Sequence, residues 1–222
     1  MARIDLRRDG NVFILTMQEG ENLFNRPFLD AFARALDEIE HSTGAAALVT
    51  IGGHEKFFSN GLDLAWLSGD GQHEGGAFIR SVLRLLGRVL AFPIPTVAAL
   101  NGHAFAAGAM LALAHDFRVM RADRGFFCLN EVDIKLPLAP GMTKLLQTRL
   151  SPTTLRDVIL TGARIGGNEA RERGIVDDAV PAAEVLPRAI ARAAALADKD
   201  RSIYGTLKRG MYADALQLLE NP

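Results

Sequence analysis

The chain has 222 residues, of which 49% are hydrophobic and 23% charged, a composition that favours one globular core and argues against disorder. Its formal charge of -1 gives no bulk attraction to nucleic acid, and its single cysteine, Cys128, excludes an intrachain disulfide or a cysteine metal cluster. The sequence shows no signal-like N-terminus and no stretch near the roughly 20 apolar residues of a membrane span. We therefore expect a cytoplasmic protein with neither nucleic-acid nor membrane partners.

The first part of the chain predicts a strand, a helix and a second strand. Val12–Met17 and Ala45–Ile51 are rich in residues that suit a buried strand. Between them, Asn25 is suited to cap a helix and Pro27 to occupy its first turn. This helix should present one apolar face, because large apolar residues recur at spacings of three and four: Phe28, Phe32, Leu36 and Ile39. Strand, helix and strand in this order indicate a parallel sheet.

The same order returns in the middle of the chain. A helix is predicted over Ala77–Leu90 and a buried strand over Ile94–Leu100, followed by a glycine- and alanine-rich turn and a further helix. Two more short strands are predicted, at Phe117–Arg121 and Phe126–Leu129.

Helical periodicity dominates the rest of the sequence. Four helices are predicted, at Thr143–Arg149, Thr153–Leu160, Val185–Leu196 and Ser202–Leu219. We therefore expect an α/β core over residues 1–180 and a short C-terminal helical region over residues 181–222.

Two loops carry the residues that suggest chemistry. The first, Lys56–Leu64, follows a predicted strand and contains Gly61, which permits a sharp bend of the backbone. Such a bend can leave the N–H of Leu62 without an internal partner and aimed at a ligand oxygen. The second, Asn101–Ala109, consists mostly of small residues between a strand and a helix, and the N-terminus of that helix supplies free N–H groups.

Both loops follow strands that are expected to be parallel, so they would place two backbone donors at one edge of the sheet. That edge is where open α/β sheets bind their ligands, and two converging N–H groups form an oxyanion hole. The alternative is that both loops are tight turns whose small residues serve close packing.

Parts of these two loops and three other segments match, in the same order along the chain, the motifs of one family: Glu21–Asn25, Phe58–Leu64, Asn101–Gly108 with Asp116, Leu160–Ile165 and Ala170–Asp177. With these segments the sequence resembles the crotonase superfamily, the family of enoyl-CoA hydratases and isomerases, over nearly its whole length. The resemblance implies an α/β fold, a crotonase-like spiral of repeated strand-strand-helix units with a helical C-terminal part, assembled as trimers or pairs of trimers. It also implies an acyl-CoA thioester as substrate and no separate cofactor, because CoA belongs to the substrate.

By this resemblance the oxyanion donors are the backbone N–H groups of Leu62 and Ala107, and the family's two proton-transfer carboxylates fall on Met110 and Glu131. A thioether neither accepts nor donates a proton at working pH, so hydration, which generally uses both carboxylates, is disfavoured. One carboxylate is enough to move a double bond from C3=C4 to C2=C3. The segment Leu129–Leu138 is similar to that of single-glutamate delta3,delta2-enoyl-CoA isomerases. Glu131 is thus the expected catalytic base, unless it is an ordinary surface carboxylate.

The remaining expected site residues surround these groups. Substrate contacts are expected from the two loops and the helices that follow them: Ser59, Asn60, Gly61, Asp63, Leu64, Trp66, Gly108 and Met110. The CoA phosphates are expected near Arg26, Lys56 or Lys208, and the histidines show no metal-binding spacing. Two other functions stay open: a non-catalytic acyl-CoA-binding protein, and a weak enoyl-CoA hydratase in which another side chain replaces the missing carboxylate.

Overall fold

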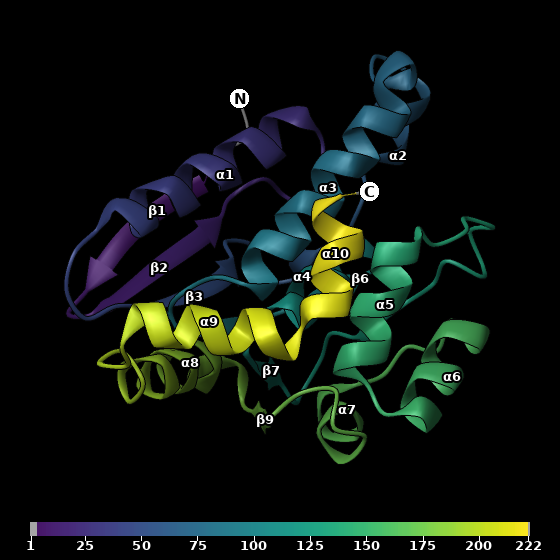
Figure 1. Cartoon of the computed structure of the whole chain (residues 1–222). Coiled ribbons are helices and arrows are strands. Elements are labelled where there is room, and N and C mark those ends of the chain that lie inside the picture. The colour runs from purple at the N-terminus through teal and green to yellow at the C-terminus, as the bar shows by residue number, and fades with distance from the viewer. Residues whose placement is uncertain (1–3, 222) are drawn as a thin grey trace.

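Two sheets form the frame of the molecule, which the computed structural model describes over residues 4–221 (Figure 1). The larger sheet has six strands in the order β1-β2-β3-β5-β7-β9, and all neighbours are parallel except β1 and β2. These strands are β1 (Ile4–Asp9), β2 (Val12–Met17), β3 (Ala47–Gly52), β5 (Thr96–Leu100), β7 (Phe117–Arg121) and β9 (Asp178–Val180). The smaller, fully parallel sheet contains β4 (Phe57–Ser59), β6 (His103–Phe105) and β8 (Phe127–Cys128).

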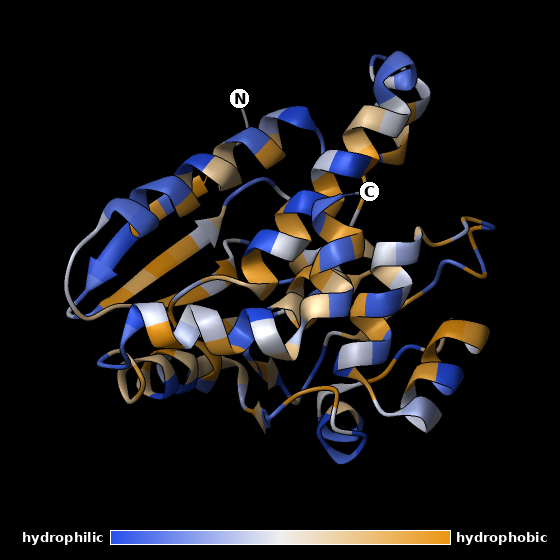
Figure 2. Ribbon diagram, in the orientation of Figure 1, coloured by the Kyte–Doolittle hydropathy of each residue, from blue (hydrophilic) through white to orange (hydrophobic). Residues whose placement is uncertain are grey.

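Helices follow most of the strands and cover the larger sheet. They are α1 (Arg26–His41), α2 (Leu64–Ser68), α3 (Gly75–Leu90), α4 (Ala107–Ala114), α5 (Pro140–Arg149), α6 (Pro152–Thr161), α7 (Gly167–Glu172), α8 (Val185–Ala194), α9 (Arg201–Met211) and α10 (Ala213–Glu220). Two short 3-10 turns lie at Gln72–Glu74 and Ala182–Glu184. Helix α1 begins where the sequence predicts, because the Asn25 side chain accepts a hydrogen bond from the Phe28 N–H at 3.0 Å. Figure 2 shows the hydrophilic residues of α1 along its outer side.

Both faces of the larger sheet are buried, because alternate residues of its strands enter two different cores. One face packs against α8 through Ile14, Val49, Val97 and Val119. The opposite face joins the main core, which also contains α1, α3 and α4, through Leu15, Leu48, Ala98 and Met120. All eight residues of α4 are buried, so this helix runs through the middle of the molecule with its two ends fixed by their surroundings.

The predicted α/β class is confirmed, and β2 and β7 have the predicted bounds. One helix prediction is wrong: Ser202–Leu219 forms two helices, because the chain turns at Tyr212 so that α10 can pack against α3 and α5. The turn predicted within Asn101–Ala109 contains the short strand β6, and β1, β9 and α7 were not predicted. The division at residue 180 stays a prediction. Among the described helices, none combines the length and the hydropathy that a bilayer crossing needs.

Candidate active site

The first donor loop follows β4 and bends at Gly61. Its φ of +86° is a left-handed conformation that glycine adopts without steric cost. Phe24 holds the bend: its N–H donates to the Gly61 carbonyl at 2.7 Å, and its carbonyl accepts from the Asp63 N–H at 2.9 Å. The N–H of Leu62, between these two bonds, has no acceptor within residues 4–221. It is therefore available to a ligand oxygen.

The second donor loop joins β6 to α4 through Ala106. This residue has φ +48° and ψ -122°, a conformation that a residue with a Cβ rarely adopts. The turn makes Ala107 the first residue of α4, ahead of the Met110 N–H that donates to the Ala106 carbonyl at 3.0 Å. In the described part of the chain the Ala107 N–H has no acceptor either, and the helix dipole adds positive potential at this end.

The two loops touch because glycines allow their backbones to approach. Strands β4 and β6 are parallel neighbours, and a Cβ placed on Gly61 would lie 3.1 Å from the Ala107 nitrogen. A Cβ on Gly108 would collide with the backbone carbonyl of Ser59. Two unpaired N–H groups are thus brought to one place at the edge of the smaller sheet.

Leu62 and Ala107 line a cavity of about 520 Å³. Its walls are mainly apolar and come from the segment before α1, both loops, α3, α4, α5 and the segment before α5: Leu23, Leu62, Leu64, Ile79, Phe105, Ala106, Ala107, Met110, Ile134, Leu136, Pro137, Leu138, Ala139 and Met142. Asn60, Asn130 and Glu131 are the polar residues among those described that line it. A mainly apolar cavity with a few polar groups is typical of a small-molecule site.

Glu131 is the one titratable side chain of residues 4–221 that lines this cavity. It is 5% exposed, and its Oε2 atom has no hydrogen-bond partner among the described residues. Burial raises the pKa of its carboxyl above the ordinary value, because the charged form loses hydration, and a backbone hydrogen bond offsets only part of that loss. It lies in a turn beyond the end of β8. A buried carboxylate with a free oxygen can accept a proton from a bound molecule.

Met110 follows Ala107 by three residues on α4. It stands at the position where, by the resemblance, the family's other proton-transfer carboxylate falls. Its side chain is 1% exposed and lines the same cavity. Of the other predicted contact residues, Asn60 and Leu64 also line the cavity, whereas Ser59, Gly61 and Gly108 shape the loops behind it. Asp63 caps α2 by accepting from the Trp66 N–H at 2.9 Å, and the Trp66 ring packs at a tilt against Phe78.

The three basic residues predicted near phosphates lie apart from one another. Arg26 pairs with Glu74 at 2.9 Å across the start of α3, and Lys56 lies over the ring of Phe57 on the smaller sheet. Lys208 is 5% exposed and pairs with Asp116 at 2.8 Å, an internal contact that leaves it unsuited to a phosphate. His103, beside the second donor loop, accepts from the Phe126 N–H at 3.2 Å among aromatic rings.

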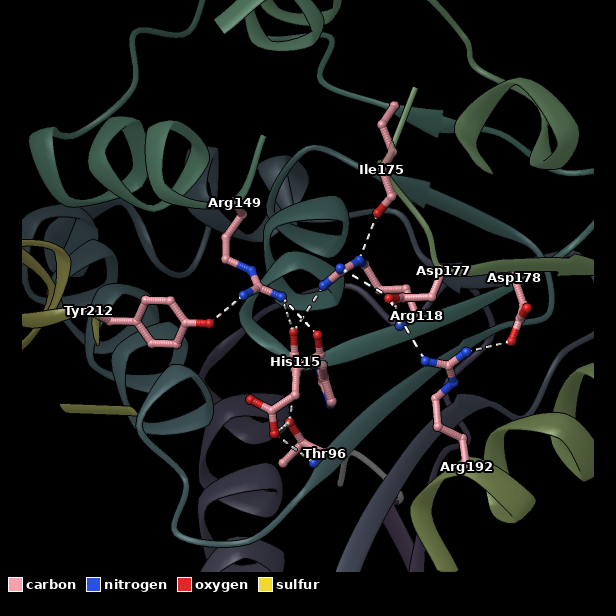
Figure 3. Close-up of polar contacts among 10 residues, drawn as sticks. Thr96, His115, Arg118, Arg149, Ile175, Asp177, Asp178, Arg192 and Tyr212 are labelled. Carbon is pink, nitrogen blue, oxygen red and sulfur yellow. Dashed lines mark hydrogen bonds and ion pairs between the residues drawn. The ribbon is translucent and has the colours of Figure 1, made fainter. Parts of the chain in front are cut away.

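A polar network fixes the other end of α4 (Figure 3). The His115 carbonyl at this helix end accepts from Arg118 at 3.0 Å and from Arg149 at 2.9 Å. Arg149 also donates to the Tyr212 hydroxyl, which links the network to the C-terminal helices. Burial lowers the pKa of His115 to about 4, so this histidine is neutral at neutral pH. The network holds α4, and therefore Ala107, in place.

Sequence reasoning missed part of the cavity. Asn130 lines it, and the Asn130 Oδ1 atom is buried without a hydrogen-bond partner in the described chain. Leu138, Ala139 and Met142 line the cavity as well and make this wall apolar. The only signal for Asn130 was its place beside Glu131. No group of three or more potential metal ligands occurs among the described residues.

Comparisons with known proteins show which family and fold the chain resembles. A family model described as enoyl-CoA hydratase/isomerase matches residues 7–221. The chain is 35% identical to enoyl-CoA delta isomerase 3 of Arabidopsis thaliana, over 97% of this chain and 94% of that protein. It is similar to the crystal structure of a probable enoyl-CoA hydratase from Mycobacterium tuberculosis, with a TM-score of 0.90 and 26% identity over 98% of this chain and 92% of that one. The fold also matches that of human mitochondrial delta3-delta2-enoyl-CoA isomerase, with a TM-score of 0.90 at 22% identity over 99% of this chain and 86% of that one.

Proposed function

The chain belongs to the enoyl-CoA hydratase/isomerase family, the crotonase superfamily, and we propose that it is an isomerase that moves the double bond of an acyl-CoA thioester from C3=C4 to C2=C3. The crotonase fold that the sequence predicts is confirmed by the structural matches. The specific reaction follows from the residues of the cavity.

The proposed reaction needs one base and one electrophilic site. The thioester oxygen accepts hydrogen bonds from the Leu62 and Ala107 N–H groups, which form an oxyanion hole. The ionised Glu131 carboxylate removes a proton from C2, and the electrons of that C–H bond delocalise onto the thioester oxygen as an enolate. When the enolate collapses, a C2=C3 double bond forms, the former C3=C4 electrons take a proton at C4 from Glu131, and the carboxylate is regenerated. No other reactant is consumed.

The observation that carries this proposal is that the cavity contains one acid and not two. Among residues 4–221, Glu131 alone of the lining side chains titrates, and the buried thioether of Met110 occupies the place where a second proton carrier would stand. A raised pKa suits Glu131 to this reaction, because it makes the carboxylate a stronger base towards the C2 proton. The apolar walls disfavour an attacking water molecule.

A homotrimer in fatty-acid metabolism and a cytoplasmic location remain predictions from the sequence. Two of the isomerase relatives are described as peroxisomal, so the compartment needs its own measurement.

Product analysis tests the proposal. The purified protein is incubated separately with a 3-enoyl-CoA and a 2-enoyl-CoA of medium chain length, and the products are identified by mass and chromatography. We expect the 2-enoyl isomer from the first substrate and no hydroxyacyl product from either. A hydroxyacyl-CoA would favour the hydratase alternative. Binding without any product would favour a non-catalytic acyl-CoA-binding protein.

A further inference from the structure

Glu131 borders a second hollow, on the other side of the segment that leads into α5. This groove has a volume of about 450 Å³. Four residues line both the groove and the active-site cavity: Glu131, Leu136, Pro137 and Leu138. A single layer of chain therefore separates the two spaces at the reacting carboxylate. In Figure 1 the segment before α5 is a thin loop at the periphery of the molecule.

The groove is bordered by apolar side chains, some of which are exposed to solvent. Val132 and Ile159 line it from the loop and from α6, together with Thr143 and the stem of Lys135. Val132 is 48% exposed and Leu136 is 39% exposed. Apolar side chains that gather at the surface beside a cavity mark a place where another apolar group binds.

The segment that separates the two spaces, residues 132–138, is held weakly. Its backbone hydrogen bonds are local: Asp133 and Ile134 donate to the Asn130 carbonyl at 3.0 and 3.1 Å, and Leu136 donates to the Glu131 carbonyl at 3.0 Å. Across residues 4–221, no side chain from residues 132–138 makes a hydrogen bond or an ion pair with the rest of the molecule. A segment with so few ties to its surroundings moves at low cost, so the Leu136 side chain can be displaced by a ligand.

We propose that this groove is a subsite for the distal methylene groups of long acyl chains, and that Leu136 yields to let the chain pass; the inference rests on the proposed function. With the thioester at Leu62 and Ala107 and C2 beside Glu131, the cavity takes the first part of the chain and the groove takes the part beyond it. Long-chain thioesters are then the preferred substrates, because each methylene removed from water strengthens binding roughly fourfold. A second protein would also cover apolar residues, but the shared wall with the cavity favours the substrate's own chain.

The test compares two chain lengths in three variants. V132N and I159N place a polar amide in the groove. L160N is the matched control, since Leu160 is 67% exposed and lies next to Ile159 on α6 but does not line the groove. The measured quantity is the ratio of kcat/KM for fourteen-carbon and six-carbon 3-enoyl-CoA. We expect this ratio to fall about tenfold in V132N and I159N, mainly through KM, and to stay within about twofold of the wild type in L160N.

Titration with saturated acyl-CoAs of the same lengths separates this proposal from the proposed function. These ligands cannot isomerise, so their dissociation constants measure the groove even if no turnover occurs. We expect the preference for the longer ligand to shrink in V132N and I159N. An unchanged preference in both variants overturns the subsite. Loss of self-association in V132N or I159N with an unchanged preference assigns the groove to a partner protein, and also overturns it.

Discussion

The two ends of α4 bury polar groups for opposite purposes. At the N-terminal end, the Ala107 N–H and the nearby Glu131 carboxylate have unpaired atoms that face a cavity. At the C-terminal end, the His115 carbonyl accepts from two arginines, and Asp116 pairs with Lys208 at 2.8 Å. Both ends are deep in the protein, so burial alone does not distinguish them.

The comparison shows that a buried polar group with a functional role is distinguished from a structural one by whether it has a partner within the protein, and not by how deeply it is buried. A buried polar group without a partner costs free energy, and it persists in a fold when a bound molecule supplies the missing partner. A buried charge with an opposite charge beside it, such as Lys208 beside Asp116, needs no ligand to neutralise it. The predictions below test whether loss of a group affects activity at one end and stability at the other.

The largest expected effect is on activity, from Glu131→Gln. The amide keeps the shape of the side chain but cannot take a proton, so kcat for isomerisation should fall about a thousandfold, while the unfolding free energy stays the same or rises. Rates with a 3-enoyl-CoA and urea unfolding are the measurements. Glu184→Gln, at an exposed position, is the control. Full activity in Glu131→Gln would falsify the single-base mechanism.

The next effect is on stability, from Lys208→Met at the opposite end. Methionine fills similar space but leaves Asp116 without its cation, so the unfolding free energy should fall by about 3 kcal/mol. The folded fraction should keep its kcat, because Lys208 does not line the cavity. Lys199→Met, at an exposed position, should change neither quantity. A large loss of kcat in folded Lys208→Met would mean that the two ends are not independent.

The pH dependence of Glu131 should have opposite signs for activity and stability. Burial raises its pKa above the ordinary 4.5, and the reaction needs the ionised form, so kcat/KM should rise with pH until the raised pKa is passed. The folded chain holds this proton more tightly than the unfolded chain. Its contribution to stability is therefore complete below the ordinary pKa and is lost as pH rises through the raised one.

The measurement is the difference between wild type and Glu131→Gln in the pH profiles of kcat/KM and of urea unfolding. Groups at the other end of α4 are the same in both proteins and cancel in this difference. An identical stability profile for the two proteins would show that the pKa of Glu131 is ordinary.

The sequence predicted the N-terminal end of α4 better than the C-terminal end. Gly61, the small residues before Ala107 and Glu131 stand in short motifs whose chemistry depends on local backbone geometry. The pairing of Asp116 with Lys208 joins residues far apart in the chain. Lys208 was one of three candidates for a phosphate contact, because a lysine's burial cannot be read from its neighbours in the sequence.

The smallest expected effect concerns backbone strain, which this end of α4 carries and the other does not. Ala106 has φ +48°, whereas His115 at the C-terminal cap has φ -72°. Ala106→Gly should therefore raise the unfolding free energy by about 1 kcal/mol, because glycine adopts this conformation without strain. Ala107→Gly makes the same chemical change one residue later, inside the helix, and should lower it by up to about 1 kcal/mol. Both variants keep every N–H donor, so a change in the unfolding free energy, measured in urea, reports the effect of backbone conformation. If both lose stability, the positive φ at Ala106 costs nothing, and the two ends of α4 differ in their partners but not in strain.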